Sequence, residues 1–171
     1  MNLLLYRMLA AVWRRIPIPL RWTILGLTHD KLLVGVSGVI LDGQGQVLVV
    51  RHRFRGPHPW GLPGGWLRGG ETPAQGWQRE IQEELGCRVA VEGMVFQGAS
   101  RWSLEFILVG RLLDGPLRPD PGEILEARFF PPEALPPGLQ PDHRLAIRRA
   151  LARRLQEPYT ADRNVVGQRG S

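Results

Sequence analysis

The 171 residues suffice for one domain with a short appendage, and 43% hydrophobic residues, 22% charged residues and six tryptophans exclude global disorder. The net charge of +6 favours anionic partners such as nucleic acid, acidic lipid or the phosphates of a small molecule. The one cysteine, Cys87, excludes an intramolecular disulfide and a multi-cysteine zinc cluster, so we expect a reducing, cytoplasmic location.

The first 27 residues are apolar enough to resemble a signal peptide, but four arginines interrupt them and Pro17 and Pro19 break the segment. Leu4, Met8 and Val12 recur at helical spacing, which predicts a short amphipathic helix. Such a helix either covers an edge of the core or lies on anionic lipid. We favour the first interpretation and predict that residues 1–30 form a helical or irregular extension that packs on the core, without stable membrane insertion.

Two β-branched segments, residues 32–41 and 46–52, flank the turn sequence Asp42-Gly43-Gln44-Gly45, which predicts a pair of strands joined by a hairpin. Further strands are predicted at residues 88–96, 102–113 and 124–130, and an arginine-rich helix at 142–155. The pattern predicts an α/β (α+β) fold in which helices pack on a mixed sheet. We assign residues 31–157 to this domain and 158–171 to a flexible tail.

A helix of about fourteen residues is predicted to begin at Thr72. Pro73 suits the first helical position, Gln75 lies where a capping box requires it, and Gly86 provides the C-terminal cap. An apolar stripe along the helix consists of Ala74, Trp77, Ile81 and Leu85.

Three carboxylates, those of Glu80, Glu83 and Glu84, share a neighbouring face of this helix. They form either a solvated acidic face or a site for a hard divalent cation, which would relieve their mutual repulsion. The glycine-rich loop before the helix, with Gly64, Gly65, Gly69 and Gly70, favours the cation site because it lets the backbone approach a phosphate ligand at a helix N-terminus.

Together these residues resemble the Nudix box. The segment GWLRGGETPAQGWQREIQEELG, residues 65–86, matches G(x5)E(x7)REUxEExGU, where U is a bulky aliphatic residue. Cys87 departs from the pattern at the last U position, where it can serve as a small buried hydrophobic residue. Residues 59–66 and 123–135 extend the resemblance, which covers about residues 32–156. It implies the Nudix α/β/α sandwich with a mixed β-sheet between helices.

The resemblance also implies metal-dependent hydrolysis of a nucleoside diphosphate linked to another group, with Mg²⁺ as the cofactor and Mn²⁺ as a substitute. It implies that a metal ion binds to Gly65, Glu80, Glu83 and Glu84. Glu80, Glu83, Glu123 and Arg79 would carry the catalysis, with Glu71 anchoring Arg79 and Gly86 supporting the site. The general base is either a box glutamate or a glutamate before the closing strand, where Glu123 is the first candidate and Glu126 the second.

Substrate contacts are predicted from residue type. Arg51 and Arg53 lie at the end of a predicted strand and could bind phosphates as guanidinium forks, with a solvated strand end as the alternative. Trp102 or Phe106 could stack on a base, with core packing as the alternative. His52 and His58 lack a partner histidine at zinc-ligand spacing.

A free nucleoside 5′-di- or triphosphate is the expected substrate, giving a nucleoside monophosphate plus phosphate or pyrophosphate. The alternatives are a nucleoside diphosphate linked to a sugar or an alcohol, and a Nudix-like module that binds nucleotide or RNA without catalysis. The P-loop pattern of another common phosphate site is absent from the sequence. We expect no nucleic-acid partner and regard a monomer as plausible.

Overall fold

The computed structural model describes residues 3–29 and 31–156, so the predicted tail at 158–171 lies outside the described residues. The chain divides into two compact units, residues 1–32 and 33–171. Each unit is described by itself.

The first unit contains two helices, α1 (Leu3–Arg15) and α2 (Ile18–Thr28). The predicted break at Pro17 is present, but α2 was not predicted. Pro19 is tolerated because it lies in the first turn of α2, where backbone N–H groups have no intrahelical acceptor and the missing N–H of proline costs no hydrogen bond. Arg21 ties the two helices together: its guanidinium donates to the carbonyl oxygens of Arg14 and Ile16, both at 2.7 Å. Neither of these helices, nor any other described helix, has the length and apolar character needed to cross a bilayer.

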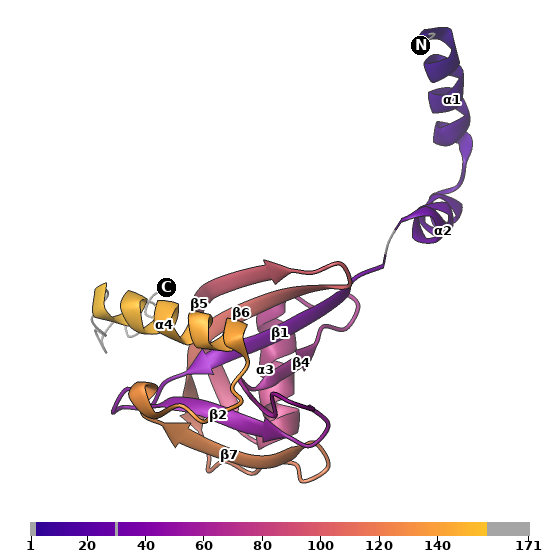
Figure 1. Ribbon diagram of the computed structural model, residues 1–171. Coiled ribbons are helices and arrows are strands. Elements are labelled where there is room, and N and C mark those ends of the chain that lie inside the picture. The colour runs from indigo at the N-terminus through magenta and orange to yellow at the C-terminus, as the bar shows by residue number, and fades with distance from the viewer. Residues whose placement is uncertain (1–2, 30, 157–171) are drawn as a thin grey trace, which may run out of the picture. The chain divides into compact units, whose positions relative to one another are not determined.

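The second unit is an α/β/α sandwich, as predicted (Figure 1). Its elements are β1 (Leu33–Ile40), β2 (Val47–His52), β3 (Trp60–Gly61), β4 (Gly64–Trp66), α3 (Pro73–Leu85), β5 (Arg88–Ala99), β6 (Ser103–Asp114), β7 (Ile124–Phe130), the 3₁₀ helix η1 (Pro132–Ala134) and α4 (Pro141–Gln156). A mixed four-stranded sheet has the order β4-β1-β6-β5, with β1 and β6 parallel, and a second, antiparallel sheet has the order β3-β2-β7.

The predicted hairpin of β1 and β2 does not form, because the two strands belong to different sheets. The turn forms, with Asp42 accepting hydrogen bonds from the N–H groups of Gln44 and Gln46, both at 2.8 Å. However, only Leu41 and Val47 form a bridge before the strands separate into different sheets. Both edges of β1 are already paired, with β4 and β6, so β2 pairs with β3 and β7 instead.

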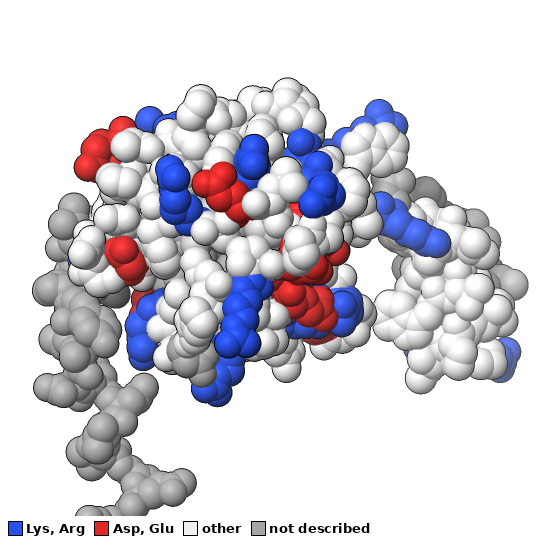
Figure 2. All heavy atoms as spheres, turned by 90° about the horizontal axis from the view of Figure 1, so that it is seen from below, with Lys and Arg blue, Asp and Glu red and all other residues white. Residues whose placement is uncertain are grey.

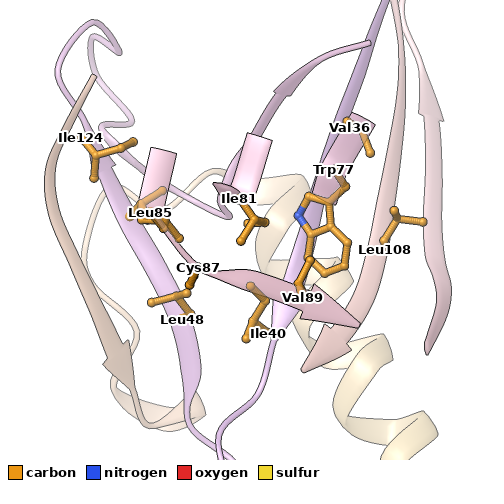
Figure 3. Close-up of a cluster of buried hydrophobic side chains, with 11 residues drawn as sticks. Val36, Ile40, Leu48, Trp77, Ile81, Leu85, Cys87, Val89, Leu108 and Ile124 are labelled. Atoms are coloured by element: carbon orange, nitrogen blue, oxygen red, sulfur yellow. The ribbon is translucent and has the colours of Figure 1, made fainter. Parts of the chain in front are cut away.

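Two buried clusters lie on opposite sides of the sheets. One packs around α3 and the other contains Ala146, Ile147 and Ala150 of α4. Figure 3 shows the first, with Trp77 and Ile81 of α3 facing the strands. Trp77 fits because two strands offer glycine beneath it: a Cβ on Gly38 would lie 2.1 Å from its Cζ2 atom. The apolar stripe of α3 therefore fixes which face of the helix remains for the carboxylates.

The ends of α3 match the sequence prediction. Thr72 caps the N-terminus, and Gln75 completes a capping box by accepting a hydrogen bond from the Thr72 N–H at 2.9 Å. Gly86 follows the last helical residue with φ of +64°, a left-handed conformation that glycine adopts without strain.

Candidate functional site

The short strand β4, which follows β3 after two residues, lies directly against α3. Gly64 has φ of +145°, and a Cβ there would lie 2.2 Å from the carbonyl oxygen of Val36. A Cβ on Gly65 would lie 2.6 Å from the carboxyl carbon of Glu80. Position 64 therefore requires glycine, whereas a side chain at position 65 would displace the Glu80 carboxylate; the two small residues bring the backbone next to the acidic face of the helix.

Arg79 holds the carboxylates of this face together. Its Nε and Nη2 atoms donate to the two oxygens of Glu71, at 2.7 and 2.9 Å, and Nη2 also donates to the Trp66 carbonyl oxygen at 2.9 Å. Its Nη1 atom donates to Glu80 at 2.6 Å and to Glu83 at 3.0 Å. One guanidinium thus fixes three carboxylates and the end of β4.

The ionisation of Glu71 follows from these bonds. The Arg79 hydrogen bond, assisted by the backbone N–H of Arg68, lowers the pKa of Glu71 to about 2. The Arg68 side chain also donates to both oxygens of Glu83, each at 3.1 Å. Negative charge at this face is therefore matched by two arginines.

Glu84 is in a different environment because it is buried. The Gly64 N–H donates to its Oε2 atom at 2.9 Å, and His52 Nδ1 lies 3.9 Å from Oε1. Burial raises the pKa of Glu84 to about 8, and the charges of Glu80 and Glu123 act in the same direction. His52 is neutral, since burial lowers its pKa to about 3. A cation beside Glu84 would favour its charged form.

A cavity of about 660 Å³ opens beside these carboxylates. Gly65, Glu80, Glu83, Glu84 and Glu123 line one part of it. Figure 2 shows acidic side chains gathered in one place on the surface of the domain, with basic side chains close by. Oxygen donors on a helix and a loop suit a hard divalent cation. Among the described residues, no three His, Cys, Asp or Glu side chains already stand as ligands around one point, and Glu80 and Glu83 are instead bonded to Arg79.

Glu123 reaches the cavity from the loop before β7. Its N–H donates to the Asp120 carbonyl oxygen at 3.1 Å, and its own carbonyl oxygen accepts from the Arg53 N–H at 2.8 Å. Glu126 lies instead on β7 near Arg51 and Arg128, at 3.8 and 3.7 Å, and does not line the cavity.

The structure does not bring the four predicted substrate contacts to the cavity. Arg51 lies over the Trp60 ring, and Arg53 donates twice to the Pro121 carbonyl oxygen, at 3.1 and 2.7 Å. Trp102 is exposed beside Arg101, and Phe106 packs against the core cluster around α3. The prediction rested on residue type at a strand end, and the β2 register shifts between Arg51 and His52, where the strand ends.

Residues that the sequence did not single out complete the cavity. Arg55 lines it, with a buried Nη1 atom that has no hydrogen-bond partner among the described residues. Phe54, Ser37 and Glu105 also line it, together with His52, which was considered from the sequence only as a zinc ligand. The one sequence signal for the position of Arg55 in the cavity is that it continues the alternating series of Arg51 and Arg53.

Comparison with known proteins identifies relatives of this arrangement. The family model described as the NUDIX domain matches residues 31–153. An NAD-capped RNA hydrolase of Pseudomonas aeruginosa is 29% identical over 141 residues, covering 80% of this chain and 48% of the relative. An RNA pyrophosphohydrolase of Rhodospirillum rubrum is 36% identical over 81 residues, covering 47% of this chain and 48% of the relative. The chain spans about half the length of these curated relatives.

The fold is also found among solved structures. A NUDIX hydrolase from Nitrosomonas europaea superposes with a TM-score of 0.66 at 23% sequence identity, covering 75% of each chain. At this sequence identity the structural similarity shows a shared fold alone.

Proposed function

The chain belongs to the NUDIX domain family, and from this premise we propose that it is a divalent-metal-dependent hydrolase of the pyrophosphate linkage in nucleoside 5′-di- or triphosphates. The observation that carries the proposal is the convergence of Glu80, Glu83, Glu84 and Glu123 on one cavity. Gly65, where a Cβ would lie 2.6 Å from the carboxyl carbon of Glu80, lines the same cavity.

In this proposal Glu80, Glu83, Glu84 and the carbonyl oxygen of Gly65 hold Mg²⁺, for which Mn²⁺ can substitute. When bound, the metal ion would supply neutralisation of diphosphate charge and would make water a stronger acid. Arg79 acts on the carboxylates and not on the substrate, since its donors are directed at Glu71, Glu80 and Glu83. It is therefore a positioning residue, held in turn by Glu71.

Glu123 is our candidate for the general base. It lines the same cavity as the box glutamates, and its backbone hydrogen bonds fix the loop that carries it. In the proposed reaction Glu123 takes a proton from the attacking water, a new P–O bond forms at phosphorus and the anhydride P–O bond breaks. The products are a nucleoside monophosphate and phosphate or pyrophosphate. Arg55 supplies positive charge at the cavity wall for the phosphates.

We propose a free nucleotide as the substrate, because the cavity has the volume of a small-ligand site. The protein would then act as a cytoplasmic enzyme, a location that its one cysteine, buried in the core, supports. No nucleic-acid partner is required, although two relatives are named for hydrolysis of RNA.

A screen of the full chain with Mg²⁺ and identification of the products tests the proposal. It compares nucleoside di- and triphosphates, nucleoside diphosphates linked to a sugar or an alcohol, and RNA with a 5′-triphosphate or an NAD cap. We expect a nucleoside monophosphate from the free nucleotides. Release of product only from a sugar-linked substrate or from RNA would move the activity to that class, and binding without any product would contradict hydrolysis.

A further inference from the structure

A carboxylate outside the box, Glu105, lies in the wall of the cavity. It sits on β6 opposite Gly35 of β1, and Gly35 in turn lies opposite Trp66 of β4. These three residues form one row across the sheet. Glu105 therefore belongs to the cavity but comes from a different element than the glutamates of α3.

Two side chains hold one oxygen of Glu105. The Ser37 hydroxyl donates to Oε1 at 3.1 Å, and His143 Nε2 lies 3.3 Å from the same atom. His143 is buried, and its Nδ1 atom accepts a hydrogen bond from the Leu62 N–H at 2.8 Å. The proton of a neutral His143 must therefore reside on Nε2, which donates to Glu105.

The second oxygen of Glu105 remains for a ligand. Both donors reach Oε1, and no hydrogen bond within residues 3–29 and 31–156 ends on Oε2. The side chain is 35% exposed, so it is accessible from the cavity. The hydrogen bond from His143 lowers the pKa of Glu105, which keeps this carboxylate an acceptor at neutral pH.

Two exposed aromatic side chains, Trp66 and Phe54, line the same cavity. The six-membered ring of Trp66 lies over Gly35, where a Cβ would be 3.5 Å from its Cζ3 atom. A flat apolar surface beside a fixed acceptor suits an aromatic heterocycle that presents N–H groups at its edge.

We propose that Glu105 selects the nucleobase of the substrate by accepting hydrogen bonds from N–H groups on the base edge. Guanine is the preferred base, because its N1–H and 2-amino groups are adjacent donors. Ser37 and His143 are positioning residues that fix the carboxylate, and Trp66 with Phe54 supplies the stacking surface. This inference rests on the proposed function for the location of the phosphates.

The test compares the full-length protein with Glu105→Gln, which keeps the size of the side chain but replaces one acceptor by a donor. We expect wild-type kcat/KM for GTP to exceed that for UTP, and for ITP, which lacks the 2-amino group, by about tenfold or more. In the Glu105→Gln variant the preference for GTP in kcat/KM should disappear because KM for GTP rises, while kcat stays nearly unchanged. Ser37→Ala should raise KM for GTP more than for UTP.

Glu92→Gln is the matched control, because Glu92 pairs with Arg111 at 3.3 Å on an exposed part of β5 and lies outside the cavity lining. The control should retain wild-type base preference. A loss that is equal for all bases in Glu105→Gln would overturn the inference. If Glu105→Gln instead changes the preference for GTP over dGTP, Glu105 contacts the ribose, and the inference is overturned as well.

Binding of GMP, IMP and UMP, measured by calorimetry with Mg²⁺, separates this inference from the proposed function. These ligands contain no anhydride and are not turned over. Preferential binding of GMP that depends on Glu105, without hydrolysis of GTP, would support the base site and reject the hydrolase. Hydrolysis of GTP together with equal binding of the three monophosphates would support the hydrolase and reject the base site.

Discussion

Arg79 and Glu71 form a two-point ion pair, with Nε and Nη2 of the guanidinium 2.7 and 2.9 Å from the two carboxylate oxygens. Glu71 lies before α3 and Arg79 in its middle. The pair therefore orients Nη1 of Arg79 toward Glu80 and Glu83. Glu71 acts on the site at a distance, through Arg79.

This relationship predicts that the substitutions Glu71→Gln and Glu84→Gln lower activity to different extents. Glu71→Gln should lower kcat by about 10- to 100-fold, as loss of a group that orients a metal ligand does. Glu84→Gln removes a ligand charge and should lower kcat further while the protein still folds. Steady-state kinetics with Mg²⁺, alongside circular dichroism, measures both. Small and equal losses would mean that the acidic face is only a solvated surface.

The cluster of carboxylates also predicts metal dependence. EDTA should abolish hydrolysis, and Mg²⁺ or Mn²⁺ should restore it. Added metal ion should raise Tm, because it binds the folded state in preference to the unfolded chain. Glu84→Gln should show a smaller rise in Tm at the same metal concentration. Full activity after exhaustive chelation would exclude the metal mechanism.

The assignment of the general base predicts a contrast between two glutamates of the same segment. Glu123→Gln should lower kcat by about 10²- to 10⁴-fold, the usual contribution of a general base. Glu126→Gln is the matched control, since Glu126 pairs with exposed arginines outside the cavity, and should retain nearly full activity. A larger loss in the Glu126 variant would reverse the assignment.

The buried Glu84 predicts a pH dependence of stability in EDTA. Its pKa is about 8 in the folded protein, against the ordinary value of 4.5 that applies to the unfolded chain. The folded state binds more protons between these values, so the free energy of unfolding should fall as pH rises from about 4.5 to about 8. Glu84→Gln lacks this ionisation and should lose less stability across that window.

Denaturant unfolding near the two ends of the window measures the difference between wild type and Glu84→Gln. Glu133→Gln, which changes an exposed carboxylate on η1, is the control and should follow wild type. The lowered pKa of His52 reduces stability toward acid in all three proteins and cancels in the comparison. Parallel pH profiles for wild type and Glu84→Gln would contradict the prediction.

The N-terminal helices carry exposed apolar side chains, among them Met8, Val12 and Trp22. We propose that the extension covers an edge of the core, so deletion of residues 1–27 should lower Tm or cause aggregation whether lipid is present or not. Melting and light scattering measure these effects. If the intact protein sediments with anionic vesicles and the truncated protein keeps its Tm and does not sediment, the helices bind lipid instead.

Local spacing was sufficient to predict α3 and its carboxylates. The cap at Thr72, the stop at Gly86 and the apolar stripe depend on neighbours along one helix. The pairing of β1 depended on strands far away in the sequence, so the turn at 42–45 formed while the expected hairpin did not. The contribution of Glu105 to the cavity likewise depends on Ser37 and His143, which come from two other elements.

The same limit applies to the arginines. Residue type and position at a strand end pointed to Arg51 and Arg53, but β2 ends at His52, and the following loop carries Arg55 to the cavity instead. Sequence patterns describe regular elements well and say little about the direction in which a loop leaves them.

Cys87 follows the C-terminal cap of α3 and is buried between that helix and the sheets, as Figure 3 shows. Because it is the one thiol in the chain, alkylation has a single target, which solvent reaches only when this part of the core opens. The labelling rate therefore reports the opening of the core beside the helix that bears the proposed metal-binding glutamates, without any introduced probe. Nucleotide or metal ion that stabilises the helix would be detected as slower labelling, independently of turnover.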